Sequence, residues 1–172
     1  MTGLGLGEPV MRHNGFLSIT HPLLAQHQGG LPGMSYDPNN IFAKILRGEA
    51  PAIRVYEDAQ TLAFMDIMPE AEGHVLVVPK EAAETLLDLS EDSARAAIVT
   101  TRRVAIAVKQ ALEASAVRVA QFSGADAGQT VPHCHFHIVP HVPGAVRSSH
   151  ATRMANPADL EVIAEKIRAA LV

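Results

Sequence analysis

The sequence predicts an α+β domain built on an antiparallel sheet. Three observations favour this class: two extended segments joined by a short turn near residue 58, a long amphipathic helical segment after residue 90, and two adjacent extended segments that follow it. Strands and helices grouped in this order favour antiparallel neighbours. The 172 residues, 48% of them hydrophobic, suffice for one well-cored domain and are short for two.

The composition excludes several classes of function. A formal net charge of -4 leaves no basic field that could hold nucleic acid by its phosphates. The single cysteine cannot form an internal disulfide, which favours a reducing cytoplasm. No apolar stretch approaches the roughly 18 residues of a membrane span, and the N-terminus has no secretory pattern. We therefore expect a cytoplasmic protein that binds neither nucleic acid nor membrane, and any bound nucleotide to be a small molecule in a pocket.

The N-terminal segment differs in composition from the remainder of the chain. Residues 1–33 hold seven of the twelve glycines and no sustained hydrophobic period, as linkers do. We predict a flexible extension over residues 1–36 and a folded domain over residues 37–172. Met34 stands just before the organised part, so translation starting there is an alternative to a mobile arm.

The first half of the folded part indicates one short helix and three strands. Asn39 begins a helical pattern that Arg47-Gly48 ends, and Pro51 then forces an extended exit. The extended segments that follow are 53–57, 61–66 and 74–78. The first two predict a hairpin with its turn at residues 57–60. The third is mostly apolar, so we expect it at the centre of the sheet.

The second half indicates a long helix, two strands and a last helix. A short helix is predicted over about 81–88, and Ser90 then caps the long one, whose first turn is acidic. Strands are predicted over 117–122 and 130–140, and Asn156-Pro157 opens the last helix. The buried stripe predicted for the long helix is Ala94, Ala97, Ile98, Thr101, Ala105, Val108 and Leu112, and that of the last helix is Leu160, Ile163, Ile167 and Leu171.

Three histidines stand at alternate positions within the last predicted strand. They are His133, His135 and His137, and the residues between and after them are Cys134, Phe136 and Ile138. Successive side chains of a strand point to opposite faces, so the three imidazoles are predicted to share one face. Imidazole titrates near neutrality, which suits proton transfer, nucleophilic attack or metal binding. The pattern alone leaves catalysis and metal ligation both open.

This run resembles the signature of the histidine triad (HIT) superfamily of nucleotide hydrolases and transferases. Further motifs follow in the family's order, and together they are similar to the Hint branch, the purine nucleoside phosphoramidases: residues 41–45, 48–52, 63–67, 73–80 and 128–131. The resemblance implies a HIT-like fold, with a five-stranded antiparallel sheet, a short N-terminal helix, a long central helix and a C-terminal helix. It also implies a homodimer that joins two such sheets into one of ten strands.

The resemblance implies catalytic roles for four histidines. The middle one, His135, attacks the α-phosphorus of a nucleotide and forms a nucleotidyl-histidine that water then hydrolyses. His133 and His137 hydrogen-bond the phosphate and the middle ring, and a protonated ring assists the departing amine. His74 matches a fourth histidine that lines the same site.

The resemblance also implies the residues that bind the substrate. Gly128 and Thr130 would donate to the phosphate with Gln129 between them, and Asp66 would hold the ribose hydroxyls. Phe122-Ser123 replaces the usual amide, so Ser123 is the polar candidate there. The residues expected to enclose the purine are Phe42, Ile45, Phe64, Ile67 and Leu76.

Metal and other cofactors are not expected. Many bacterial members hold a structural zinc with two cysteines and a histidine, and this chain has Asn40, Ala43 and Ala82 at those positions. The leading hypothesis is thus a metal-independent hydrolase of nucleoside phosphoramidates or aminoacyl adenylates. One alternative is a dinucleoside polyphosphate hydrolase of the Fhit type. The other is a non-catalytic protein that binds nucleotides, or zinc through its three imidazoles.

Overall fold

The computed structural model describes residues 36–144 and 154–171. These belong to one compact unit that spans residues 35–172. The predicted extension, residues 1–36, lies outside the described residues except for Tyr36, so it stays a prediction. No helix in the described part of the chain is long and apolar enough to cross a membrane.

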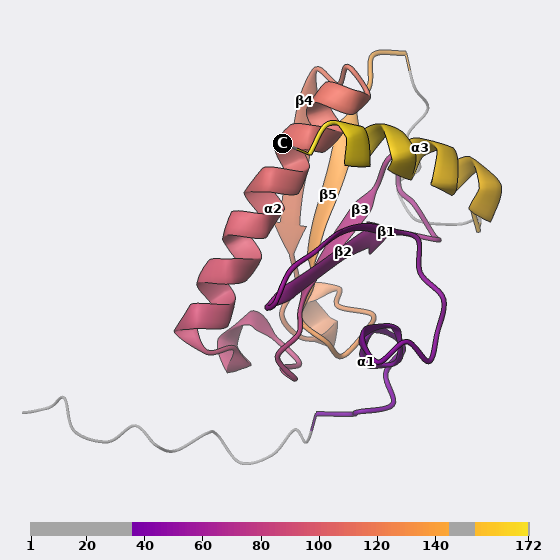
Figure 1. Ribbon diagram of the computed structural model, residues 1–172. Coiled ribbons are helices and arrows are strands. Elements are labelled where there is room, and N and C mark those ends of the chain that lie inside the picture. The colour runs from indigo at the N-terminus through magenta and orange to yellow at the C-terminus, as the bar shows by residue number, and fades with distance from the viewer. Residues whose placement is uncertain (1–35, 145–153, 172) are drawn as a thin grey trace, which may run out of the picture. The chain divides into compact units, whose positions relative to one another are not determined.

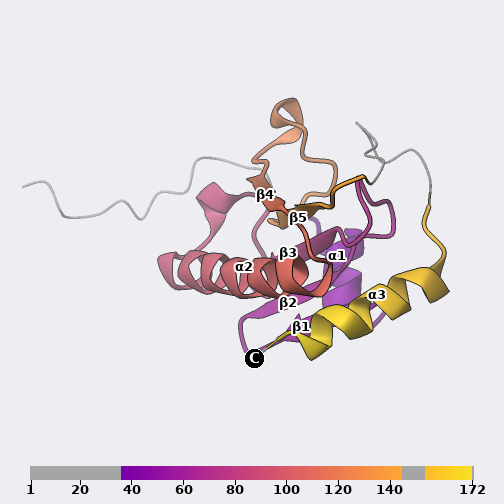
Figure 2. The same cartoon turned by 90° about the horizontal axis from the view of Figure 1, so that it is seen from above.

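The described residues form a five-stranded antiparallel sheet, as predicted. The strands are β1 (Arg54–Glu57), β2 (Thr61–Met65), β3 (Val75–Pro79), β4 (Ala116–Gln121) and β5 (Phe136–His141). Their order is β1-β2-β3-β5-β4, and Figure 2 shows them following one another in this sequence. The central position of β3 is confirmed, and all five of its residues are buried.

Three α-helices of the described residues begin at side-chain caps. They are α1 (Ile41–Leu46), α2 (Glu91–Ala111) and α3 (Pro157–Ala169). The side chains of Asn40, Ser90 and Asn156 each accept a hydrogen bond from a backbone N–H of the first turn, which satisfies a donor that the helix itself leaves unpaired. The long central helix and the C-terminal helix are therefore confirmed with their predicted starts.

The two faces of the sheet pack against different helices. The alternation along β2 and β3 sends Ala63, Met65, Val75 and Val77 into one core with α2 and α3, and Figure 1 shows α2 running alongside the strands. The opposite side chains of the same strands, such as Leu76, pack with α1 in a second cluster. This smaller helix covers its face only in part, which leaves room for a cavity there.

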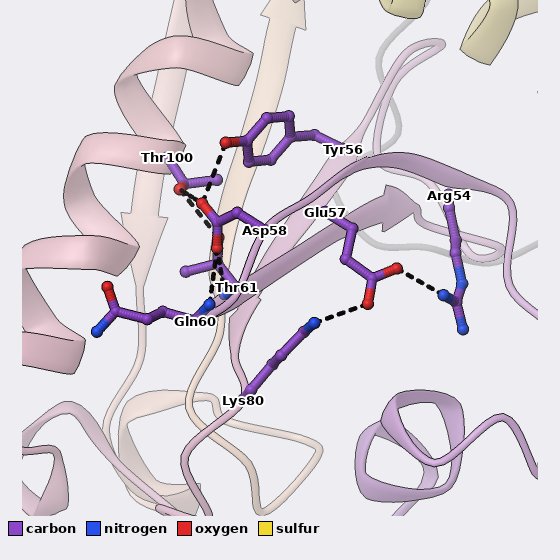
Figure 3. Close-up of polar contacts among 8 residues, drawn as sticks. All are labelled: Arg54, Tyr56, Glu57, Asp58, Gln60, Thr61, Lys80 and Thr100. Atoms are coloured by element: carbon purple, nitrogen blue, oxygen red, sulfur yellow. Dashed lines mark hydrogen bonds and ion pairs between the residues drawn. The ribbon is translucent and has the colours of Figure 1, made fainter.

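The β1–β2 turn is tied together by one carboxylate (Figure 3). Asp58 Oδ1 accepts the backbone N–H groups of Gln60 and Thr61 at 2.9 and 2.7 Å, and the hydroxyl of Thr61 at 2.9 Å. The Thr61 hydroxyl lies 2.9 Å from that of Thr100 on α2. The hairpin predicted with its turn at residues 57–60 is confirmed, and its turn is anchored to the long helix.

The predicted short helix over residues 81–88 is wrong in extent. Only Leu86–Asp88 forms a 3-10 turn, capped by the Thr85 side chain. The backbone before it is used elsewhere, since the Ala83 carbonyl accepts the N–H of Cys134 at 2.8 Å. A carbonyl bonded to a distant segment does not take part in a local helical ladder, so the helix does not form.

The buried face of α2 also differs from the predicted stripe. Ile98 is 51% exposed, whereas Val104, absent from the prediction, is fully buried. Thr100 is also buried, and its hydroxyl bonds that of Thr61. The hydrophobic period did not predict this buried polar contact. The prediction holds for Ala97, Thr101 and Val108, which are buried.

The last strand is shorter than predicted. A strand over residues 130–140 was expected, but β5 begins only at Phe136. The N–H groups just before it bond outside the ladder: that of Cys134 donates to Ala83, and that of His133 donates to the Val131 carbonyl at 2.8 Å. His133 and His135 therefore lie in an irregular segment, and of the three histidines only His137 belongs to the strand.

Candidate functional site

A cavity of about 920 Å³ lies on the face of the sheet that α1 partly covers. Most of the predicted site residues line it: Phe42, Ile45, Phe64, Asp66, Ile67, His74, Leu76, Gly128, Thr130, His135 and His137. Three predicted site residues do not line it, namely His133, Ser123 and Gln129. The fold thus brings together residues separated by nearly one hundred positions in the chain.

His135 presents one free ring nitrogen to this cavity. Its Nδ1 lies 2.6 Å from the backbone oxygen of His133. A carbonyl oxygen only accepts, so Nδ1 carries the proton and Nε2 keeps its lone pair. Burial lowers the pKa of His135 and favours the neutral ring. An imidazole held in this tautomer is a nucleophile.

His133 lies behind His135 and is fully buried. Its Nε2 is 2.8 Å from the Pro79 oxygen, and its Nδ1 is 2.6 Å from the Tyr36 hydroxyl. Both ring nitrogens therefore have protein partners, and neither faces the cavity as the prediction of a phosphate contact required. What His133 supplies to the site is its backbone oxygen, which sets the tautomer of His135.

His74 and His137 form a hydrogen-bonded pair. Nε2 of His74 lies 3.0 Å from Nδ1 of His137, and Nδ1 of His74 accepts the backbone N–H of Glu70 at 3.2 Å. In the neutral pair His74 therefore donates to His137, which leaves the His137 proton on Nε2. Burial lowers the pKa of each ring to about 4. The rings of His137 and His135 are 4.9 Å apart.

Asp66 completes this group of polar side chains. Its Oδ2 lies 3.2 Å from Nδ1 of His74, and burial raises the pKa of its carboxyl. Asp66, His74 and His137 offer ligand atoms within 4.8 Å of one another, so these residues could hold a divalent cation. In the neutral pair Nδ1 of His74 carries no proton, so a hydrogen bond to Asp66 requires the protonated carboxyl, the form that the raised pKa of Asp66 favours.

In the loop before the histidines, Gly128 and Thr130 are exposed and Gln129 between them is buried. Gly128 adopts φ +99°, in the left-handed region that glycine tolerates, and it lines the cavity with Thr130. The Gln129 side chain points inward: Oε1 accepts the N–H of Gly124 at 2.7 Å, and Nε2 donates to the oxygen of Glu84 at 2.7 Å. Gln129 thus holds the loop in place.

Ser123 is occupied on the other side of the loop. Its hydroxyl donates to Gln121 Oε1 at 3.0 Å and lies 3.3 Å from the donating N–H of Leu86. Its neighbour Phe122 does line the cavity, and its ring centroid is 5.5 Å from that of His137. An aromatic ring therefore stands where the resemblance led us to expect an amide.

The apolar part of the cavity is a slot between α1 and the sheet. Phe42, Ile45, Phe64 and Leu76 are buried in one cluster, and the rings of Phe42 and Phe64 meet edge to face at 5.5 Å. Ile67 is 47% exposed at its rim. Such a slot with a few polar groups at one end is the usual form of a small-molecule site.

Sequence reasoning missed three polar residues around the histidines. Arg118 and Glu70 form an ion pair and both line the cavity, while Tyr36 bonds His133. The strand register could have indicated Arg118, because Ala120 lies opposite His137 and alternate residues of β4 share a face. Glu70 and Tyr36 lie outside regular elements, and no sequence period marks them.

Comparison with known families gives one match at the level of a family model. The HIT domain matches residues 47–144, which include β1 to β5 and the three histidines. A solved structure of a HIT-like protein from Bartonella henselae is 46% identical, with a TM-score of 0.74. The similarity covers 80% of this chain and 100% of that one.

Two curated relatives are similar over 100 or more residues. A HIT-like protein from Azospirillum brasilense is 42% identical over 106 residues, which are 60% of this chain and 87% of the relative. The adenosine 5′-monophosphoramidase hnt1 of Schizosaccharomyces pombe is 39% identical over 100 residues, which are 58% of this chain and 72% of the relative.

Proposed function

Since this chain belongs to the HIT domain family, we propose that it hydrolyses nucleoside phosphoramidates or aminoacyl adenylates at the α-phosphate. The reaction passes through a covalent nucleotidyl-histidine on His135. The observation that carries the proposal is the 2.6 Å hydrogen bond from His135 Nδ1 to the His133 oxygen. With the proton on Nδ1, Nε2 keeps a lone pair that can attack phosphorus in the cavity.

In the first step, Nε2 of His135 forms a bond to phosphorus. The P–N bond to the amine breaks, its electron pair stays on the amine nitrogen, and that nitrogen takes a proton from His137. The neighbourhood supports this role, because the ring centroid of His137 lies 4.9 Å from that of His135. A bound phosphate places negative charge beside His137, and an opposite charge favours the protonated imidazole that burial otherwise disfavours.

In the second step, water attacks the phosphorus of the intermediate. The bond to Nε2 breaks and returns its electron pair to His135, while His137 takes the proton of the water. The free enzyme is restored with a nucleoside monophosphate as product. Backbone and hydroxyl donors at Gly128 and Thr130 stabilise the charge on the phosphate oxygens in both steps. His74 orients His137 through the 3.0 Å hydrogen bond.

The remainder of the cavity selects a purine ribonucleotide. The slot formed by Phe42, Ile45, Phe64 and Leu76, with Ile67 at the rim, takes the base, and Asp66 accepts from the ribose hydroxyls. The relative from Schizosaccharomyces pombe, named an adenosine 5′-monophosphoramidase, supports this substrate class.

The same proposal includes a homodimer. β4 is an edge strand of the sheet, and an edge with free backbone groups can pair with a second copy. Large apolar side chains are exposed beside it: Val119 on β4, and Ile98, Val99 and Ile106 on α2. Two copies related by a two-fold axis would cover both features and extend the sheet to ten strands.

Turnover of adenosine 5′-phosphoramidate, with and without EDTA, tests the reaction. We expect release of the monophosphate that EDTA does not affect, and a loss of about 10⁴-fold or more in His135→Ala. His141→Ala, the same change at the last residue of β5 and outside the cavity lining, should keep the activity.

Four outcomes would overturn the assignment. Faster cleavage of diadenosine polyphosphates would favour the Fhit-type reaction, and loss of activity with EDTA would favour a metal. Full activity in His135→Ala, or trapped reaction mixtures without phosphorus bonded to that ring, would remove His135 from its role.

A further inference from the structure

We propose that Tyr36 is a positioning residue for His135, which it reaches through His133. The kinetic part of this inference rests on the proposed function, but its structural part does not. Tyr36 is outside the cavity lining and touches no proposed substrate group. Its hydroxyl lies 2.6 Å from Nδ1 of His133, a residue 97 positions away in the chain.

The inference begins from the shortness of β5. Because the strand starts at Phe136, no ladder of backbone hydrogen bonds aligns His133 and His135. These residues must be held by individual contacts instead. The backbone contributes the bond from Cys134 to Ala83, but the direction of the His133 ring depends on its own two nitrogens.

The partners of those nitrogens select one tautomer. Nε2 of His133 faces the Pro79 carbonyl at 2.8 Å, and a carbonyl cannot donate, so Nε2 carries the proton. Burial lowers the pKa of His133 and keeps the ring neutral, which leaves Nδ1 as an acceptor. The Tyr36 hydroxyl is therefore the donor of the 2.6 Å hydrogen bond.

Tyr36 lies just before α1 in the chain and packs against His133. Its ring meets the His133 ring edge to face, with centroids 5.6 Å apart. Four residues later, Asn40 donates from Nδ2 to the Pro132 oxygen at 3.4 Å while it also caps α1. The segment that leads into α1 thus restrains Pro132 and His133, which stand three and two residues before His135.

The consequence for the active site follows from the His133 oxygen. This oxygen sets the tautomer and direction of His135, so any rotation of the His133 residue displaces the nucleophile. Without the Tyr36 hydroxyl, Nδ1 of His133 becomes a buried acceptor without its donor, and the other tautomer and ring positions become more populated. A small misplacement of a nucleophile is enough to slow its attack.

The second tyrosine of the chain provides a matched control. The Tyr56 hydroxyl also bonds a side chain, donating to Asp58 Oδ2 at 3.1 Å, but at the β1–β2 turn (Figure 3). Tyr56 is outside the cavity lining, and its hydroxyl bonds no histidine. The Tyr56 hydroxyl also accepts a hydrogen bond from Nη1 of Arg103. Tyr36→Phe and Tyr56→Phe therefore remove the same atom, but only the Tyr36 hydroxyl bonds His133.

The kinetic test compares both variants with the unaltered protein on adenosine 5′-phosphoramidate. We expect Tyr36→Phe to lower kcat about tenfold with little change in KM, because the nucleophile is misplaced and the nucleotide slot is intact. Tyr56→Phe should retain the kcat of the unaltered protein. An unchanged kcat in Tyr36→Phe, or a rise in KM alone, overturns the positioning role.

A spectroscopic test is independent of activity. In protein labelled with ¹⁵N at histidine, the two ring nitrogens of His133 should show the Nε2–H tautomer, and Tyr36→Phe should shift the Nδ1 resonance towards that of an unbonded nitrogen. If the chain does not hydrolyse phosphoramidates, no sample shows turnover, but the His133 spectra still differ between the unaltered protein and Tyr36→Phe. A His133 spectrum that is the same with and without the hydroxyl overturns the inference.

A second replacement keeps the test decisive if Tyr36→Phe folds poorly. In the Tyr56→Phe protein Tyr36 is the only tyrosine, so biosynthetic incorporation of 3-fluorotyrosine alters that hydroxyl alone. Fluorine makes the hydroxyl a stronger donor and hardly changes the shape of the ring. We expect the His133 Nδ1 resonance to move in the direction opposite to that caused by loss of the donor, and no movement contradicts the hydrogen bond.

Discussion

At the scale of the residue, hydrogen bonds within the protein orient the side chains of the site. His135 is oriented by a backbone oxygen, His137 by His74, and the loop beside them by Gln129. Gln129 is buried, and its amide also donates to the Val131 oxygen at 2.9 Å. The residue between the two expected phosphate donors thus acts on the backbone of the loop.

Gln129→Ala should destabilise this loop and weaken catalysis. It removes the partners of the Gly124 N–H and of the Glu84 and Val131 oxygens, so we expect a loss of about 2–3 kcal/mol in the free energy of unfolding. Displacement of the loop should also lower kcat/KM by about tenfold to a hundredfold. Urea unfolding and steady-state kinetics measure the two effects.

Gln60→Ala is the matched control, since its exposed side chain lies at the β1–β2 turn. It should change neither quantity. If Gln129→Ala were as stable and as active as this control, the inward role of the amide would be wrong.

The residues of the site were predictable to different degrees. The alternation of His135 and His137 with apolar residues suggested a shared face, and the resemblance to the HIT family added His74 and Asp66, which the fold brings to hydrogen-bonding distance. The inward turn of Gln129 and the burial of His133 were not predictable. Local spacing does not tell whether a polar side chain finds its partner in solvent, substrate or protein.

At the scale of the element, regular segments followed their sequence patterns and irregular ones did not. The caps at Ser90 and Asn156 and the apolar run of β3 determined those elements locally. The segments at 81–88 and 130–135 depended on each other, because the Ala83 carbonyl and the Cys134 N–H form a bond between them. A pattern read in either segment alone could not include that bond.

Val119→Asp tests the element proposed to pair with a second copy. Val119 is 46% exposed on β4, opposite Ile138 in the strand register. A buried, unpaired carboxylate in the dimer contact would be costly, so we expect the 18.3 kDa chain to change from a dimer to a monomer. Light scattering coupled to size-exclusion chromatography measures the mass.

Val162→Asp places the same charge on α3, where the valine is 56% exposed, and should leave the mass unchanged. A monomeric unaltered protein, or a dimer that persists in Val119→Asp, would contradict the proposed contact.

At the scale of the whole molecule, buried imidazoles link stability to pH. Burial lowers the pKa of His74 and of His137 from about 6.5 to about 4, so the unfolded chain binds more protons than the folded one between these values. Their contribution to stability is complete above pH 6.5 and is lost as the pH falls towards 4. Several carboxylates with lowered pKa values, such as Glu57 and Asp58, add losses only in the more acidic range.

The free energy of unfolding should therefore fall between pH 6.5 and pH 4.5, before the carboxylates titrate. For one histidine with such a lowered pKa the full loss down to pH 4 is about 3 kcal/mol. Urea unfolding at half-unit intervals measures the slope, and His137→Gln should make it shallower. A flat dependence over this interval would mean that the two rings are already charged in the folded protein.

The sequence by itself determined the class of the fold, the central strand and the capped helices, since hydrophobic period and capping act over a few residues. It also predicted three imidazoles on one face, of which His135 and His137 line the cavity. The tertiary structure decided where β5 begins, that His133 is enclosed, and that Tyr36, Glu70 and Arg118 join the histidines. Those features depend on hydrogen bonds between segments as far apart as 97 positions, which form only when the whole chain has packed.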